Sequence, residues 1–294
     1  MWLLPVRLGI GLLVVGVAAC AAVRTQDSAK QEKAPPPDVR RDIPYGGAGG
    51  EDSLRRYLDV HRPVADGPLP AVILVHGGSW ARGGRHRMER VAERAVERGY
   101  VAVNIEYRLA PDHRHPTQLA DVLDAVCWVR AHAEEFGIDP ERIALWGYSA
   151  GAHLSLLAAA RPDLAAAGER CAQVPATVQA CVAGAGPTDL RLLGAAGPVR
   201  DFLGGSPAEI LPVYEEASPL LAADGDHPPT FLYHGRSDWI VDVEHSRQMH
   251  DALEAAGVTV ELLETDDGHI TAARIAELPI DRGFDFLDRH LRGA

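Results

Sequence analysis

From residue 54 onward, hydrophobic and polar positions follow each other in blocks whose period changes repeatedly. Short continuous apolar runs are typical of strands that are buried on both faces of a sheet. The sequence predicts such strands at residues 71–75, 100–105, 143–146, 178–183, 230–233 and 258–263. Residues 54–61 alternate more loosely, which favours a strand at a sheet edge.

Between these runs, apolar side chains recur three and four residues apart, which is the spacing of a helix that covers a core. Helices are predicted at residues 88–96, with Gly99 closing the segment, and at residues 119–129, 150–160, 244–256 and 270–291. Alternating strands and helices imply a mostly parallel sheet with helices on both faces. Roughly eight strands would use the chain to its end, which leaves little for a second domain.

Residues 187–226 break this alternation, because they are rich in Gly, Pro and Ala. We expect them to form a small cap at the carboxyl edge of the sheet, where ligands bind in such folds.

The first residues resemble a targeting signal. Arg7 is the only charge before the apolar stretch 8–20, which is too short to cross a ~30 Å hydrocarbon core and suits a signal peptide. Val-Ala-Ala-Cys at residues 17–20 resembles the bacterial lipobox, whose cysteine becomes the first mature residue and carries lipid. We therefore expect residues 1–19 to be a signal peptide and Cys20 to be lipidated, so that the protein is exported and held in the bacterial cell envelope. An ordinary secretory signal, an uncleaved anchor and an intracellular protein with a wrongly assigned start are the alternatives.

Residues 24–44 are polar and proline-rich, so residues 20–44 are expected to be a lipidated cysteine and a flexible linker, and residues 45–294 the folded domain. Export would permit a disulfide between Cys171 and Cys181, which leaves Cys127 alone on a helix face. Three buried thiols are the alternative, because spacing alone does not fix the geometry of a disulfide.

Composition narrows the functional classes. The chain has 294 residues, 47% of them hydrophobic, which indicates a globular protein. Its 41 acidic and 29 basic side chains give a formal charge of −12, which argues against nucleic-acid binding and against membrane attraction beyond the lipid. Five histidines show no spacing typical of a metal site, so neither metal nor cofactor is expected: His113, His115, His245, His250 and His290.

The sharpest motif is Gly-Tyr-Ser-Ala-Gly at residues 147–151, between a predicted strand and a predicted helix. It matches G-x-S-x-G, in which a strained turn projects the serine hydroxyl above the sheet and glycines avoid collisions with crossing backbone. The helix N-terminus behind Ser149 offers free N–H groups to developing negative charge. Ser149 is therefore the predicted nucleophile; a tight packing turn is the alternative.

A second motif, His-Gly-Gly-Ser-Trp at residues 76–80, follows the first long strand. Glycines let backbone N–H groups approach a ligand oxygen closely, so Gly77 and Gly78 are candidates for an oxyanion hole together with the N–H of Ala150. His76 is expected to hold this loop in place. A plain glycine turn is the alternative.

A serine nucleophile needs an imidazole base and an acid that orients the imidazole. His269 lies in the turn between the last strand and the last helix, and Asp238 follows the strand at residues 230–233. Their order after Ser149 is that of α/β-hydrolases. Asp242 is a rival acid if the loop is one turn longer, whereas the aspartates at residues 266–267 are too close to His269 in the same turn.

With these motifs the sequence resembles the α/β-hydrolase superfamily, and more narrowly the carboxylesterases with hormone-sensitive-lipase-like and acetylxylan- or feruloyl-esterase-like signatures. The resemblance runs from about residue 45 to the C-terminus, with further matching stretches at residues 58–63, 107–111, 136–143, 186–190 and 234–235.

This resemblance implies a triad of Ser149, His269 and Asp238, an oxyanion hole from the His-Gly-Gly loop and Ala150, and no cofactor. Many members carry a third glycine where this chain has Ser79. Because Ser79 brings a hydroxyl to this loop, the identity of the second donor to the oxyanion stays open. Among the loop N–H groups we favour that of Gly78.

The fold expected from the resemblance is an α/β-hydrolase fold, with a mostly parallel eight-stranded sheet and a small cap segment. The expected activity is hydrolysis of small, short-acyl esters through an acyl-enzyme, including acetyl esters of carbohydrates, because a short cap suggests an open site. A serine peptidase or aminopeptidase of the same fold and a non-catalytic, lipid-anchored interaction protein are the alternatives. Trp80 and Trp239 are candidates for the pocket wall.

Overall fold

The computed structural model describes residues 36–46, 55–164, 170–270 and 277–293. The predicted signal peptide, Cys20 and most of the predicted linker lie outside these residues, and so does part of the predicted last helix. Within the described ranges, none of the helices combines the length and the apolar character needed to span a membrane.

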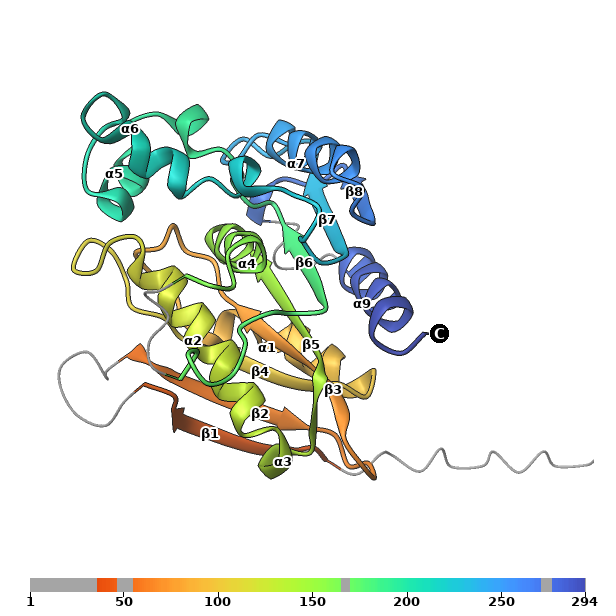
Figure 1. Ribbon diagram of the computed structural model, residues 1–294. Helices are drawn as coiled ribbons and strands as arrows, with labels where there is room; N and C mark the ends of the chain where they lie inside the picture. The colour runs from red at the N-terminus through yellow and green to blue at the C-terminus, as the bar shows by residue number, and fades with distance from the viewer. Residues whose placement is uncertain (1–35, 47–54, 165–169, 271–276, 294) are drawn as a thin grey trace, which may run out of the picture. The chain divides into compact units, whose positions relative to one another are not determined.

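Eight strands form one sheet in the order β1-β2-β4-β3-β5-β6-β7-β8 (Figure 1). They are β1 (Asp38–Pro44), β2 (Tyr57–Arg62), β3 (Leu69–Val75), β4 (Val101–Ile105), β5 (Ile138–Tyr148), β6 (Ala180–Gly184), β7 (Thr230–Gly235) and β8 (Val260–Thr265). Strands β3 to β8 run parallel to one another. Strand β2 pairs antiparallel with β1 on one side and with β4 on the other. This confirms the predicted mostly parallel, eight-stranded fold.

Helices cover both faces of the sheet. Neighbouring residues of a strand point to opposite faces, so a strand made only of apolar residues has to be covered on both. Ile73 of β3 belongs to one core cluster and Leu74 to the other. The first cluster packs beneath α2 (Thr117–Ala131), α4 (Ala150–Ala160) and α7 (Glu244–Ala255), and the short α3 (Ala133–Phe136) adds to it. The second lies beneath α1 (Glu89–Glu97), which follows the 3₁₀ turn η2 (Arg85–Met88), and beneath α9 (Glu277–Leu291).

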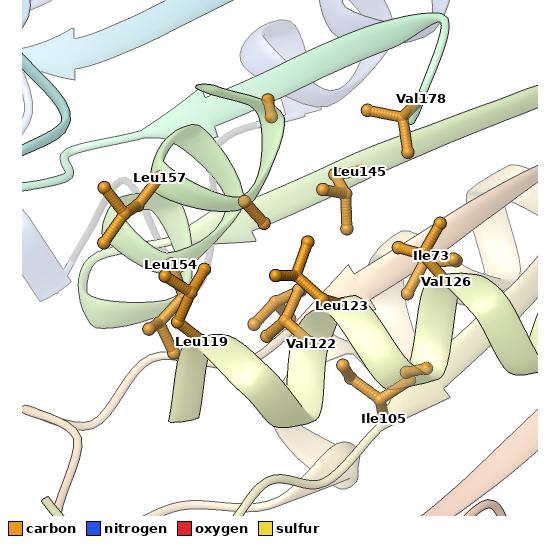
Figure 2. Packing of buried hydrophobic residues seen from close by; sticks show 14 of the residues in the cluster. Ile73, Ile105, Leu119, Val122, Leu123, Val126, Leu145, Leu154, Leu157 and Val178 are labelled. Atoms are coloured by element: carbon orange, nitrogen blue, oxygen red, sulfur yellow. The ribbon is translucent and has the colours of Figure 1, made fainter. Parts of the chain in front are cut away.

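Helix α2 departs from the amphipathic helix that the sequence predicts, because residues 118–129 are all buried. Its apolar side chains, among them Leu123 and Val126, face α4 and the strands (Figure 2). The opposite face carries two carboxylates that are covered by arginines: Asp121 bonds with Arg108 and Asp124 pairs with Arg56. Ion pairing therefore lets the polar side of this helix be buried as well.

The folded part of the chain begins before residue 45, so the predicted end of the linker at residue 44 is wrong. Residues Asp38–Pro44 form β1, which pairs with β2, so that β2 is not at the sheet edge as predicted. Only Val39 and Ile43 of this strand are partly buried. Two apolar side chains among charged ones and a register shift at Arg40 give a weak sequence signal, which explains the error.

The disulfide also differs from the expected pairing. Cys127 of α2 is bonded to Cys171, with 5.4 Å between their Cα atoms, and Cys181 is a free, buried thiol in β6. The expected Cys171–Cys181 bond is therefore wrong. The segment around Cys171 crosses α2, and Arg170 pairs there with Asp124. Spacing along the chain does not reveal this crossing.

The cap between β6 and β7 matches the predicted segment (Figure 1). It consists of η4 (Leu190–Leu193), α5 (Gly197–Leu203), α6 (Pro207–Glu216) and η5 (Pro219–Ala222). Ser206 begins α6 with a capping box, in which its side chain and that of Glu209 each bond the other's backbone N–H. The cap packs on α4 through η5.

Candidate active site

Ser149 lies on a strained turn between β5 and α4. Its φ of 57° and ψ of −123° are unusual for a residue with a side chain. A Cβ on Gly147 would lie 2.1 Å from the carbonyl oxygen of Gly151, and a Cβ on Gly151 would lie 2.0 Å from that of Val75. Only glycine fits at both positions, and the turn presents the hydroxyl of Ser149 at the carboxyl end of β5.

His269 meets Ser149 from the loop after β8. Its Nε2 lies 2.9 Å from Ser149 Oγ, and its Nδ1 lies 2.6 Å from Asp238 Oδ2. Tyr148, the second residue of the serine motif, donates a hydrogen bond from its hydroxyl to the carbonyl oxygen of His269. The structure therefore joins the three predicted side chains in one hydrogen-bonded chain, and it shows a role for Tyr148 that the sequence analysis missed.

Asp238 is held as an ionised acceptor. Its Oδ1 accepts hydrogen bonds of 2.9 Å from the N–H groups of Ile240 and Val241, and its Oδ2 lies 3.2 Å from His234 Nε2. Burial by itself would raise the pKa of Asp238, but the hydrogen bonds from His234, His269 and the Val241 N–H outweigh it and hold the pKa well below its usual range. Asp238 is therefore a carboxylate whenever the protein is near neutral pH.

The rival aspartates have other partners. Asp242 Oδ1 accepts the N–H of Glu244 at 2.9 Å, at the start of α7. Asp266 pairs with Arg236 at the surface, and the carbonyl oxygen of Asp267 accepts the N–H of Ser237. Of the four aspartates considered from the sequence, only Asp238 bonds with His269.

The loop with Gly77 and Gly78 lies against the nucleophile turn. A Cβ on Gly77 would lie 2.6 Å from the carbonyl oxygen of Tyr148, and a Cβ on Gly78, whose φ is +137°, would lie 1.8 Å from that of Arg82. In the part of the chain that the structure describes, no acceptor bonds the N–H of Gly77, Gly78 or Ala150. Within the described residues, the N–H groups that the sequence analysis assigns to an oxyanion hole therefore keep no protein acceptor.

Trp80 is buried and holds this loop against α4 and the cap. The expectation that it forms a wall of the pocket is therefore wrong. The exposed fraction of Trp80 is 3%, and its indole stacks on Phe202 of α5 with 4.6 Å between ring centres. Its Nε1–H donates to His153 Nδ1, and His153 Nε2 in turn donates to the carbonyl oxygen of Ala217. Burial lowers the pKa of His153 to about 3, so this link between loop, α4 and cap stays uncharged.

His76 lies in the position expected of a residue that holds the loop. Its ring is buried, its Nδ1 lies 3.0 Å from the carbonyl oxygen of Gly77, and it stacks on Tyr107 with 4.3 Å between ring centres. Tyr107 donates a hydrogen bond to the backbone carbonyl of His76. Burial lowers the pKa of His76 to about 4, which keeps the ring neutral.

One group among the described residues has the ligand atoms that a metal ion needs within reach of each other, namely His250, Asp251 and Glu254 on the surface of α7. None of them is a predicted site residue, and exposed carboxylates are common without an ion.

A parallel sheet with a serine on its central strand–helix turn, and with an acid and a histidine on later loops, defines an α/β-hydrolase. More particularly, the family model BD-FAE matches residues 58–253, and the chain belongs to this family.

Curated relatives agree with this assignment. The chain is 34% identical over 228 residues to "Probable carboxylic ester hydrolase LipM" of Mycobacterium tuberculosis, covering 73% of this chain and 53% of the relative. It is 32% identical over 264 residues to "Esterase LipC" of the same organism, covering 85% and 60%. The chain thus spans little more than half the length of these relatives.

Solved structures show the same fold. A "truncated form of carbohydrate esterase from gut microbiota" superposes with a TM-score of 0.80 at 21% identity, covering 87% of this chain and 96% of that one. Esterase Est2 of Thermogutta terrifontis with bound butyrate superposes with a TM-score of 0.72 at 24% identity, covering 85% and 93%.

Proposed function

We propose that this protein is a serine carboxylesterase that hydrolyses short-acyl esters through an acyl-enzyme, with Ser149, His269 and Asp238 as its triad. The observation that carries the proposal is the hydrogen-bonded chain from Ser149 Oγ through the imidazole of His269 to Asp238 Oδ2. The esterase names of its relatives support the same class of substrate.

The reaction follows from this geometry. Ser149 Oγ attacks the ester carbonyl carbon while its proton moves to His269 Nε2, and the negative oxygen is held by the N–H groups of Ala150 and of Gly77 or Gly78. The tetrahedral intermediate collapses, His269 gives its proton to the leaving alcohol, and the acyl group stays on Ser149. Water then repeats the sequence and releases the acid. Each oxyanion donor contributes about 3–4 kcal/mol to the lowered barrier.

The test is turnover of p-nitrophenyl acetate by the wild-type protein and by Ser149→Ala. We expect kcat to fall by roughly five to six orders of magnitude with the same thermal unfolding midpoint, because only the nucleophile is removed. Ser155→Ala, in the middle of α4, is a matched control that keeps the nucleophile. Equal turnover by wild type and Ser149→Ala would exclude the mechanism, and faster cleavage of aminoacyl amides than of esters would exclude the substrate class.

We also propose that the protein is exported and anchored through lipid on Cys20. The Val-Ala-Ala-Cys sequence after the apolar stretch supports this, and so does the Cys127–Cys171 disulfide, because disulfides persist mainly in oxidising compartments. Labelling cells with radioactive palmitate should mark the wild-type protein and leave Cys20→Ala unmarked. Equal label on both proteins, or none on the wild type, would refute the proposal.

A further inference from the structure

Exposed apolar side chains gather on the segments that carry the triad and on the cap. Six of the eight large hydrophobic residues exposed in the described ranges follow the carboxyl ends of β6, β7 or β8. They are Leu192, Leu211, Leu221, Trp239, Ile240 and Ile270. Single exposed apolar residues are ordinary, so the ones that bear on the site are those close to triad residues in the chain, Trp239, Ile240 and Ile270.

Trp239 is the most exposed of them, at 83%, and it directly follows Asp238. Its loop is fixed on both sides. Asp238 Oδ1 accepts the N–H groups of Ile240 and Val241, and His234 Nε2 donates to the carbonyl oxygen of Val241 at 2.9 Å. The indole is thus presented to solvent by a well-bonded turn.

The direction of proton transfer decides which part of an ester would meet this indole. His269 Nε2 must deliver its proton to the leaving oxygen, so the alcohol lies on the histidine side of Ser149, whereas the carbonyl oxygen faces the oxyanion donors. Ile270 follows His269, and Trp239 follows the acid bonded to that histidine. Neighbouring Cα atoms are ~3.8 Å apart, so Trp239 and Ile270 begin next to the backbone of the acid and of the base.

We propose that Trp239, together with Ile270, forms a subsite for the alcohol part of the substrate, and that it binds the flat apolar face of a six-membered ring. A pyranose and a phenol share this chemistry, since both present such a face to an indole. The inference rests on the proposed esterase function and adds which part of the ester is recognised.

The test compares Trp239→Ala with wild type on three acetate esters, those of ethanol, phenol and methyl β-xyloside. The subsite predicts that kcat/KM falls roughly 10-fold for a ring-bearing ester, the effect of uncovering part of an indole face, and stays within about 2-fold for ethyl acetate. Deacylation starts from the same acetyl-enzyme for all three, so its rate should not change. A fall for only one ring identifies the physiological ring chemistry, and Trp239→Phe should retain most of the preference.

Val64→Ala is the matched control, because Val64 is 62% exposed in the turn that precedes β3, at the opposite end of that strand from the site. It should leave all three substrates unchanged. An equal fall on ethyl acetate and both ring esters, or no fall on either ring ester, would overturn the subsite.

Equilibrium binding separates this inference from the esterase proposal. Phenol and methyl β-xyloside are titrated into Ser149→Ala and into Ser149→Ala/Trp239→Ala while the heat of binding is followed by calorimetry. The subsite predicts a saturable signal with at least one ring compound that Trp239→Ala abolishes, even if the wild-type protein hydrolyses none of the esters. Absence of saturable binding to Ser149→Ala, or equal binding by both proteins, would overturn the subsite whatever the hydrolysis assay gives.

Discussion

Replacing the carboxylate of Asp238 by an amide tests the hydrogen-bond arrangement of the site, because every lone pair on that side chain faces a donor. Oδ1 accepts two backbone N–H groups, and Oδ2 lies near His269 Nδ1 and His234 Nε2. In Asp238→Asn the amide oxygen is expected at the Oδ1 position, because the other orientation would turn the NH₂ group toward two backbone donors.

That orientation points the new NH₂ group at His269 Nδ1. The imidazole must then accept there and carry its proton on Nε2, toward Ser149, which is the wrong tautomer for a base. We expect kcat to fall about 10⁴-fold, which corresponds to roughly 5.5 kcal/mol in the barrier. The NH₂ group also faces the N–H of His234, a donor–donor contact that should destabilise the fold by about 1–3 kcal/mol.

The assay is kcat for p-nitrophenyl acetate together with the urea unfolding midpoint. Asp242→Asn is the matched control, since that carboxylate bonds the backbone of α7 and should leave kcat within about 2-fold. If Asp238→Asn kept a tenth of the wild-type kcat, or if the two variants lost activity equally, the assignment of Asp238 as the orienting acid would be refuted.

Further outcomes follow from other contacts. Trp80→Phe keeps the stacking but removes the donor to buried His153, and it should lower the free energy of unfolding by about 1–3 kcal/mol; an unchanged urea midpoint would contradict the described link. Cys127→Ser opens a loop between cysteines 44 residues apart, so roughly 4 kcal/mol of stability should be lost, and reduction of wild type should give the same loss while leaving the variant unaffected. Because the pKa of Asp238 is lower in the folded state than in the unfolded chain, its contribution to stability is present above the unfolded pKa and disappears as pH falls through the folded one. Stability should therefore decrease below about pH 4 more steeply in wild type than in Asp238→Asn, and parallel pH profiles would argue against this linkage.

The sequence predicts the central strands for a physical reason, and the structure joins by hydrogen bonds the three side chains that it proposes as a triad. Strands buried on both faces are continuous apolar runs, and the carboxyl ends of parallel strands meet at one edge, where Ser149, Asp238 and His269 come together. The predicted helix at residues 150–160 coincides with α4, because the strained serine turn sets its first residue.

Features that depend on long-range packing were predicted less well. Strand β1 is formed by a charged segment whose stability comes from pairing with β2. The disulfide depends on a segment that crosses α2 at Cys127, and the burial of α2 depends on arginines distant in sequence, such as Arg56. The contact of Trp80 with Phe202 requires the cap to fold onto the loop, which local patterns do not encode.

The most direct test of the central claim is to treat the protein with a fluorophosphonate and locate the adduct by peptide mass spectrometry. Activation of Ser149 by His269 predicts one adduct on Ser149, no adduct in Ser149→Ala and a rate reduced by several orders of magnitude in His269→Ala. An adduct on Ser79 instead, or labelling of Ser149 at the same rate without His269, would contradict it.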